Sequence, residues 1–335
     1  MADVPWISAH LFHRGSLDEL ITGAVAPLVE ELTRSGALGG FFFLRYWEGG
    51  PHLRLRLRPS SPGHTVPVRA ALLERATRYL TDHPSPPAPA SYTTEAYRAM
   101  AQRVAHAERL SYHDSQLHPD DTVEFIPYRP EYHAYGRRPA LTAVETHFTE
   151  SSAIALGLLT AGTSPAQRHA AALAMLMLTL AVCEPNLARV ASRLRAVPAD
   201  HIQRLTAADP AARALQDSYR NNGHALREQA RDLWARAGRP CQTPLSGHLA
   251  GWLHAIRTLH TQLTTAHAQG RFSPTDSLFP LTRLTRAVSS QSPAVAQVVL
   301  RCTHLLCNRL GIHTTAEAHL ASLVARTLTD LNQER

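Results

Sequence analysis

The chain has 335 residues, 44% of them hydrophobic, which is enough for one large domain or two modest ones with a buried core. This composition excludes a chain that is disordered throughout. The formal net charge is +7, and all 34 lysine-plus-arginine positions are arginine, which favours an anionic or acidic partner.

The sequence lacks the common motifs for metals, nucleotides and export. Its cysteines and histidines have no metal-ligand spacing, so we expect neither a metal nor another cofactor. It has no glycine-rich nucleotide-binding motif and no zinc-protease or serine-hydrolase motif. Its basic residues are not interleaved with a stacking surface, so we expect no direct binding to nucleic acid. With no export pattern at the start and an apolar run at 170–183 too short for a bilayer, we expect a soluble, cytoplasmic protein that binds no membrane.

The first elements in chain order are a strand, a helix and a second strand. Ser16 followed by Glu19 matches a capping box and opens the helix, in which Pro27 predicts a kink. A glycine-rich stretch ends the helix. The three elements are predicted at residues 6–12, 17–34 and 41–47.

Residues 52–58 alternate strictly between polar side chains and leucines. In a strand, His52, Arg54, Arg56 and Arg58 then point to one face and the leucines to the other. Such a row of arginines suits carboxylates, phosphates or a developing enolate, because guanidinium is always charged and donates two parallel hydrogen bonds. The alternative is a solvated edge strand whose charges prevent aggregation. A Gly-Gly turn predicts an antiparallel hairpin with the preceding strand, where Arg45 could join the row or form a rim ion pair.

The remainder of the chain is predicted to be mainly helical. A proline-rich linker at 84–89 separates two helices, and residues 122–128 alternate as a last strand. The predicted helices cover 68–82, 94–110, 140–161, 165–182, 186–196, 211–237, 246–268, 292–310 and 315–332. We therefore predict an α+β fold, a small antiparallel sheet in the N-terminal third packed with a predominantly helical remainder. We expect one unit over 1–335, with a β-containing lobe at 1–138 and a helical lobe at 139–335.

The helix predicted at 292–310 carries a second set of candidate residues. Arg301, His304 and Asn308 are spaced by three and four, so they share one helix face. A histidine flanked by an arginine and an amide is a candidate acid/base. The alternative is a core histidine satisfied by the asparagine, or a polar face that pairs with another helix.

Three segments, in this order, carry a resemblance to a known family. They are residues 42–46 with 52–56, residues 128–136 with Glu145 and Phe148, and residues 304–310. Together they resemble the C-terminal domain of lantibiotic dehydratases, which also occurs as stand-alone thiopeptide-type bacteriocin biosynthesis proteins. The resemblance extends from Trp6 to about Leu328.

The resemblance implies chemistry on a ribosomally made precursor peptide with a leader. In the dehydratases, one domain glutamylates Ser or Thr with glutamyl-tRNA, and the C-terminal domain eliminates glutamate to leave dehydroalanine or dehydrobutyrine. This chain resembles the elimination half and would need a separate glutamylating partner. A related branch, the thiopeptide pyridine synthases, joins two dehydroalanines in a formal [4+2] cycloaddition and then loses water and the leader peptide.

The resemblance also implies roles for individual residues. Arg54 and Arg56 match the elimination arginines, and His304 matches the acid/base histidine. One departure is Ala134, which stands where the family has an arginine before its Tyr-Gly pair; Arg129 or Arg137 could compensate. The residues expected to bind substrate are Arg45, His52, Arg129, Tyr135, Arg137, Arg301 and Asn308.

These observations leave three hypotheses. The first is a carbon–oxygen lyase that eliminates glutamate, and the second is a pyridine-forming cyclase on the same scaffold. The third is a non-catalytic subunit that docks an acidic leader on the arginine-rich face.

Overall fold

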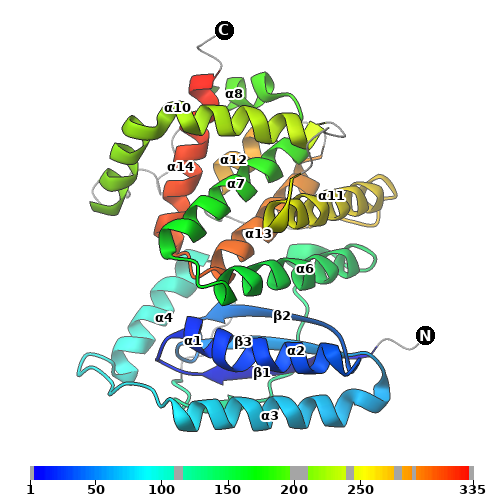
Figure 1. Cartoon of the computed structure of the whole chain (residues 1–335), viewed down its shortest axis with the longest axis vertical. Coiled ribbons are helices and arrows are strands. Elements are labelled where there is room, and N and C mark those ends of the chain that lie inside the picture. The colour runs from blue at the N-terminus through cyan, green and yellow to red at the C-terminus, as the bar shows by residue number, and fades with distance from the viewer. Residues whose placement is uncertain are drawn as a thin grey trace. The chain divides into compact units, whose positions relative to one another are not determined.

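The computed structural model describes residues 4–108, 116–196, 210–238, 245–274, 281–288 and 292–331. The chain divides into two compact units, whose elements are labelled in Figure 1. The first unit runs to Arg129 and includes Leu159–Ala161, and the second comprises Pro130–Leu158 and Gly162–Arg335.

The first unit contains a four-stranded antiparallel sheet in the order β2-β3-β1-β4. The predicted hairpin and the first three predicted strands are confirmed. Because β3 lies between β2 and β1, both of its edges are paired, and the alternative of a charged edge strand is wrong. The strands are β1 (Ile7–Phe12), β2 (Leu38–Tyr46), β3 (His52–Pro59) and β4 (Thr122–Glu124).

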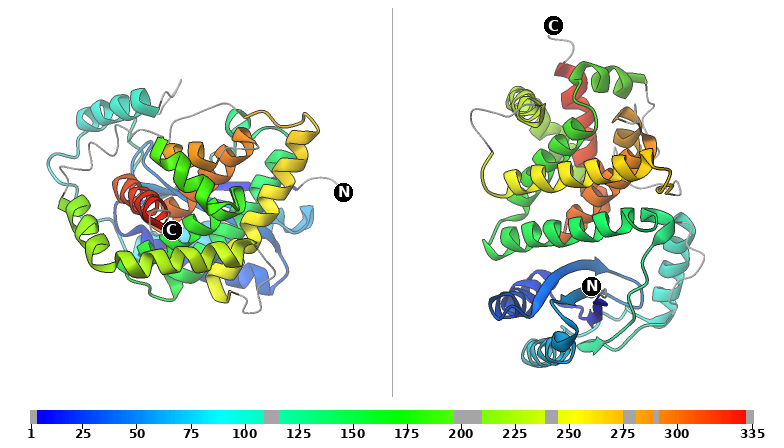
Figure 2. Two further views of the ribbon diagram at one scale, coloured as in Figure 1. Left: turned by 90° about the horizontal axis from the view of Figure 1, so that it is seen from above. Right: turned by 90° about the vertical axis from the view of Figure 1, so that its right-hand side faces the viewer.

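One face of this sheet is covered by helices. Leu53, Leu55 and Leu57 on β3 are at most 1% exposed, and they share their face with Phe41 and Phe43 of β2. Figure 2 shows α2 (Ala26–Arg34) and α3 (Thr65–Asp82) on the same side of the sheet. The alternation of β3 therefore buries the leucines under helices and directs the arginines to the opposite face.

The predicted kink in the first helix is a π-helical turn. Residues Ile21–Val25 form this turn between α1 (Leu17–Leu20) and α2, and Pro27 follows in the first turn of α2. Proline cannot donate a backbone hydrogen bond, so the widened turn ahead of it accommodates the interruption. The Ser16 Oγ accepts from the Glu19 N–H at 3.3 Å, which confirms the predicted N-cap.

The linker after α3 is tied to the sheet by Asp121. Its carboxylate accepts hydrogen bonds from His13 Nδ1 at 2.7 Å, from Ser85 Oγ at 2.7 Å and from the Ser85 N–H at 2.7 Å. Beyond it, β4 ends at Glu124 instead of extending to residue 128 as predicted. The prolines at 127 and 130 lack the N–H that a longer ladder would need.

The other described helices agree with the predicted pattern except for two short additions. The short helices α5 (Tyr132–Tyr135) and α12 (Thr282–Val288) were not predicted. The first unit also holds α4 (Thr94–Glu108). The helical unit contains α6 (Ala140–Thr160), α7 (Pro165–Cys183), α8 (Leu187–Ala196), α10 (Pro210–Gly238), α11 (Gly247–Ala268), α13 (Pro293–Arg309) and α14 (Thr314–Leu331). The predicted α+β class is confirmed.

Helix α7 is the centre of the helical unit. It packs against α10, α11 and α13, and all its residues from Ala172 to Ala181 are buried. The fully buried Trp252 of α11 donates its indole N–H to the Met175 carbonyl at 2.9 Å. Among the described helices, α7 alone is long and apolar enough to cross a membrane by length and composition, and 56% of that stretch is buried. These contacts are those of a core helix.

Candidate functional site

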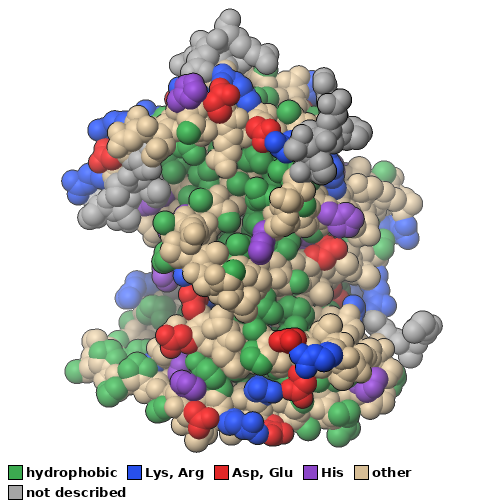
Figure 3. Space-filling view, in the orientation of Figure 1, with side chains coloured by type: hydrophobic (Ala, Val, Ile, Leu, Met, Phe, Trp, Pro, Cys, Tyr) green, Lys and Arg blue, Asp and Glu red, His purple; other side chains and the backbone are tan. Residues whose placement is uncertain are grey.

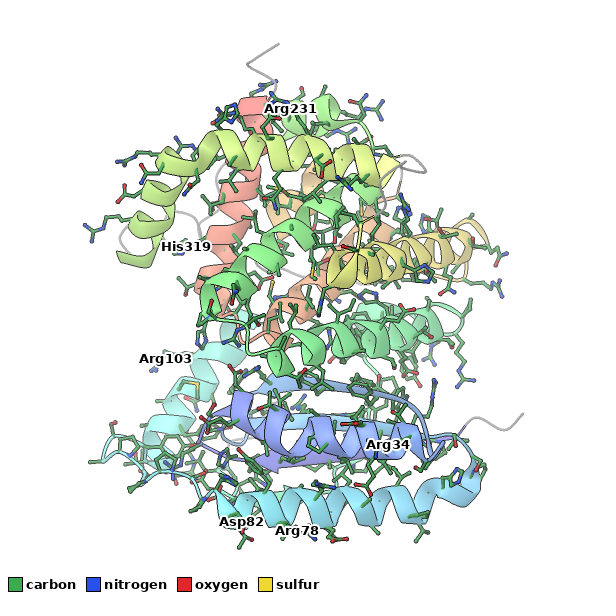
Figure 4. All side chains as sticks on the ribbon, in the orientation of Figure 1. Arg34, Arg78, Asp82, Arg103, Arg231 and His319 are labelled. Carbon is green, nitrogen blue, oxygen red and sulfur yellow. The ribbon has the colours of Figure 1, made fainter. Side chains whose placement is uncertain are left out.

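The face of the sheet opposite the leucines of β3 forms what we call the arginine face. Its members follow from the strand register, since residues directly opposite each other share a face. Figure 4 shows the side chains of the described residues as sticks on the ribbon. The arginine face consists of His52, Arg54, Arg56 and Arg58 on β3, Ser8, His10 and Phe12 on β1, and Phe42, Leu44 and Tyr46 on β2.

Arg54 is held by contacts on three sides. Its Nη2 lies 3.0 Å from the Glu48 Oε2, and its Nε donates to the His52 Nε2 at 3.3 Å. The guanidinium also lies over the Tyr46 ring, 3.4 Å from the centroid. Arg54 is therefore an arginine with its own carboxylate and its own aromatic platform.

Arg56 is the most buried arginine of β3, with 7% exposure. Its Nη2 lies 3.3 Å from the His10 Nε2, and its guanidinium lies over the Tyr128 ring at 5.8 Å from the centroid. Tyr128 also packs edge-on against Phe42 at 5.7 Å. Arg56 is thus a positive charge set among aromatic and imidazole rings.

The two histidines of the arginine face are neutral, contrary to the expected cationic row that included His52. Burial is the largest of the causes that lower the pKa of His52 to about 3, and the charge of the nearby Arg54 is another. Burial, followed by the charge of Arg56, lowers the pKa of His10 to about 2. The His52 Nδ1 lies 2.8 Å from the Gly50 carbonyl and so carries the proton, which leaves Nε2 to accept from Arg54. Each imidazole therefore serves as a hydrogen-bond acceptor for a guanidinium.

Arg45 does not join this row. It pairs with Leu53 in the register, so its side chain lies on the helix-covered face, where Nη2 reaches the Asp18 Oδ1 at 2.5 Å. Neighbouring side chains on a strand point to opposite faces, and Arg45 points to the same face as the leucines of β3. The rim ion pair is the correct interpretation of this residue.

Two other candidate arginines of the first unit, Arg58 and Arg129, have different surroundings from Arg54 and Arg56. Arg58 stacks on the Trp6 indole at 5.0 Å and donates to the Gly39 carbonyl at 3.5 Å. Arg129 is exposed. The structure therefore groups Arg54, Arg56 and His52 closely and leaves Arg129 outside that group.

In the helical unit, a buried tyrosine lies beside an arginine of α13. Tyr135 ends α5, and the Arg301 guanidinium lies 5.7 Å from its ring centroid while donating to the Ala134 carbonyl at 3.1 Å. Burial raises the pKa of Tyr135 well above its ordinary value, so the phenol stays protonated. Arg301 thus binds the backbone of Ala134, where the family resemblance predicts an arginine side chain. Arg137 instead is exposed and stacks on the Tyr132 ring at 4.9 Å.

The chain bends sharply after Tyr135. Gly136 has φ +79° and ψ −178°, a conformation that only glycine adopts easily. A Cβ there would lie 2.9 Å from the Phe272 ring. A glycine at position 136 is therefore required for α5 to end at Tyr135.

His304 is paired with a carboxylate that was not predicted. Its Nδ1 lies 2.7 Å from the Oε2 of Glu317 on α14, whose side chain is 1% exposed, while the His304 side chain is 28% exposed. The pair fixes the proton on Nδ1, so Nε2 is the ring nitrogen that can take up a second proton. The predicted neighbour Asn308 lies one turn further along the same helix and is half-buried.

Sequence reasoning missed Glu317 because its local pattern has a simpler explanation. Thr314 followed three residues later by Glu317 has the spacing of a capping box, which normally leaves the glutamate at an exposed helix start. The Glu317 N–H does bond to the His313 carbonyl at 2.9 Å, yet the carboxylate points inward. The sequence did contain one signal. Only a short turn joins α13 to α14, so residues near the start of α14 can lie close to His304.

Three further ionisable groups of this unit are buried. Burial raises the pKa of the Cys302 thiol to about 12, and burial followed by the adjacent Glu317 charge raises that of Cys307 well above its ordinary value. Burial lowers the pKa of Arg309 to about 10, so it stays charged. The described residues contain no cluster of three or more side chains able to hold a metal ion. The chemistry available here is proton transfer by His304, with Tyr135 and Arg301 as hydrogen-bond donors.

Comparison with known proteins gives a consistent set of matches. A family model described as lantibiotic biosynthesis dehydratase C-term matches residues 6–328. The pyridine synthase TbtD from thiomuracin biosynthesis has a TM-score of 0.74 at 20% identity, over 99% of this chain and 100% of that chain. TsrL has a TM-score of 0.63 at 18% identity, over 98% of this chain and 95% of that chain.

A third solved structure is much longer than this chain. The tRNA-dependent lantibiotic dehydratase MibB from Microbispora sp. 107891 has a TM-score of 0.47 at 20% identity, over 100% of this chain and 29% of that chain. A comparison with curated proteins found no match. The first two structures share the fold of this chain.

Proposed function

The chain belongs to the family of lantibiotic biosynthesis dehydratase C-terminal domains, and on this premise we propose that it is a thiopeptide pyridine synthase. Such an enzyme acts on a ribosomally synthesised precursor peptide that carries two dehydroalanines. It joins them in a formal [4+2] cycloaddition and then releases water and the leader peptide. The likeness to the pyridine synthase TbtD supports this choice, because the match covers 99% of this chain and 100% of that chain.

The observation that carries the proposal is the pair of His304 and Glu317. In this reaction an amide must take its iminol form before the ring closes, and the adduct must lose a hydroxyl as water. Both steps move a proton to or from an amide or hydroxyl oxygen. His304 is suited to this task because Glu317 holds its Nδ1 proton at 2.7 Å and its Nε2 can exchange a proton.

Donors beside such a base would stabilise the charge that develops on oxygen. Tyr135 stays protonated, and the Arg301 guanidinium lies 5.7 Å from its ring centroid in the same unit. We propose that they hold the reacting amide, while Arg54, Arg56 and His52 of the arginine face bind the peptide.

The choice of cyclisation over glutamate elimination rests on Arg54 and Ala134. Elimination releases a glutamate anion, which needs a cation ready to receive it. Arg54 already has Glu48 as its carboxylate at 3.0 Å, and the expected arginine is replaced by Ala134. Cyclisation releases only water and an amide, which are neutral.

Glutamate elimination is the second candidate, and Arg56 is the observation that favours it. This buried guanidinium lies beside the neutral His10 and over the Tyr128 ring on the arginine face. It would stabilise an enolate or a departing carboxylate. That reaction would need the separate glutamylating partner and the cytoplasmic location that the sequence predicts.

The deciding experiment supplies the purified protein with two peptides in separate reactions. One peptide has a leader and two dehydroalanines, and the other carries a glutamylated serine. We expect mass spectrometry to show loss of water and leader from the first peptide only. Free glutamate from the second peptide would establish elimination instead, and turnover of neither would overturn both enzyme proposals in favour of a peptide-binding subunit.

A further inference from the structure

We propose that Glu48 is a specificity-determining residue that keeps Arg54 from binding an anionic group of the substrate. This inference deepens the proposed function and rests on it, because a pyridine-forming site has only neutral groups to accept. The carboxylate of Glu48 would occupy the position on Arg54 that the carboxylate of a glutamylated peptide would otherwise take.

The geometry of Arg54 leaves little of it for a second carboxylate. A guanidinium binds a carboxylate best through two parallel N–H groups, and the side-on pair consists of Nε and one Nη. In this chain Nε donates to the His52 Nε2 at 3.3 Å and Nη2 to the Glu48 Oε2 at 3.0 Å. One flat side of the group rests on the Tyr46 ring.

The pairing is built into the hairpin between β2 and β3. Glu48 opens the turn, and the two glycines that follow have φ of +81° and +115°. The Gly49 N–H donates to the Tyr97 hydroxyl, and the His118 N–H donates to the Gly49 carbonyl at 2.8 Å. A turn fixed by these contacts holds Glu48 beside Arg54, six residues away in sequence.

The ion pair of Arg54 and Glu48 is less exposed to water than an ordinary surface ion pair. The side chains of Arg54 and Glu48 are 20% and 17% exposed, so water screens their attraction less than it does for Glu74 and Arg78 of α3 at 69% and 61%. Arg58, on the same strand, instead has a carbonyl and an indole ring as its partners among the described residues. The carboxylate partner is therefore a property of the Arg54 position and not of the whole strand.

The test measures binding of a carboxylate probe to Glu48→Gln by isothermal titration calorimetry. Glutarate is the probe, and glutaramide is its neutral counterpart. We expect Glu48→Gln to bind glutarate about tenfold more tightly than the wild type does, since a charge-assisted hydrogen bond is worth roughly that factor. Binding of glutaramide should not change.

Three further variants show that the gain acts through Arg54. Glu48→Asp keeps the charge and should bind glutarate as weakly as the wild type. The double variant Glu48→Gln with Arg54→Gln should lose the gain. Glu74→Gln removes one carboxylate from an exposed arginine pair, on the helix where Arg78 points outward in Figure 4, and should leave glutarate affinity unchanged.

A Glu48→Gln protein that melts like the wild type but gains no glutarate affinity would overturn the inference, and so would an equal gain in Glu74→Gln. If Glu48→Gln proves unstable, Glu48→Ala takes its place. Because glutarate binding needs no turnover, the result is independent of the pyridine assay. A gain in glutarate affinity without pyridine formation in the activity assay would support the role of Glu48 and overturn only the proposed pyridine synthase activity.

Discussion

His304 of α13 and Glu317 of α14 form a hydrogen-bonded pair in which only the histidine reaches the surface. The 2.7 Å contact joins Nδ1 to a carboxylate that is 1% exposed. A buried carboxylate in this position selects the tautomer of the imidazole and stabilises its protonated form. The pair is therefore the group in the described helical unit best arranged to take a proton and return it.

Glu317→Gln should lower kcat by about 10²–10⁴-fold, the usual range for loss of general acid–base catalysis. The amide cannot stabilise a protonated imidazole, so His304 becomes a weaker base. The measurement is turnover of the dehydroalanine peptide across pH, with His304→Ala for comparison. His313→Gln, an exposed histidine beside α14, serves as the control. Unchanged turnover in Glu317→Gln would remove the pair from the mechanism.

Arg56→Ala should lower turnover strongly while the protein stays folded. Its guanidinium lies among His10 and Tyr128 on the arginine face, and loss of one preorganised donor typically costs about 10²–10³-fold in rate. Arg58→Ala, which removes a stacked arginine further along the same strand, should cost less. Steady-state kinetics and circular dichroism together check this, and full activity of Arg56→Ala would exclude Arg56 from the site.

Gly136→Ala should destabilise the helical unit by about 1–3 kcal/mol, since its backbone conformation is one that residues other than glycine adopt only under strain. The added methyl would also meet the Phe272 ring at 2.9 Å. The matched control is Gly162→Ala, where φ is +68° and nothing lies within 4 Å of the new methyl. Urea unfolding of both variants gives the comparison, and an equal cost at both sites would mean that Phe272 plays no part.

Acid should weaken the first unit through His10 and His52. Their pKa values fall to about 2 and about 3 in the folded protein, because burial and the nearby arginines oppose the charge. Below the unfolded pKa near 6.5, the unfolded chain binds protons that the folded chain does not. Their contribution to stability is therefore complete above that pH and is lost as the pH falls toward 3.

For each histidine the loss between pH 7 and pH 5 should be about 2 kcal/mol. The free energy of unfolding, measured in urea at both pH values, should fall less in His52→Gln than in the wild type. The same pH dependence in both proteins would show that His52 is not a neutral buried group.

Periodicity predicted the elements that hold the site but not the partners of its residues. The alternation of residues 52–58 and the spacing of Arg301 and His304 depend on local geometry, and both predictions agree with the structure. The pairing of His304 with Glu317 depends on the angle between two helices, which a one-chain pattern does not contain. The charge state of His52 depends on burial by other strands.

Arg45 shows how a local pattern can mislead. Its place near the turn suggested the arginine row, but one position of strand parity put it on the other face with Asp18. Figure 3 shows acidic and basic side chains intermingled over α2 and α3, and there the spacing of Glu30 and Arg34 does predict an ion pair. Side-chain pairs within one helix follow from sequence alone, whereas pairs between elements require the register.

The strict alternation of β3 also protects the fold against mispairing. A shift of one residue against β1 or β2 would drive Arg54, Arg56 and Arg58 beneath the helices and turn Leu53, Leu55 and Leu57 outward. Burying three guanidinium groups in an apolar core is so costly that this mispaired hairpin would not persist. The arginines that we propose to bind the substrate peptide thus also protect the register of β3 during folding, and replacing them with neutral side chains would remove that protection.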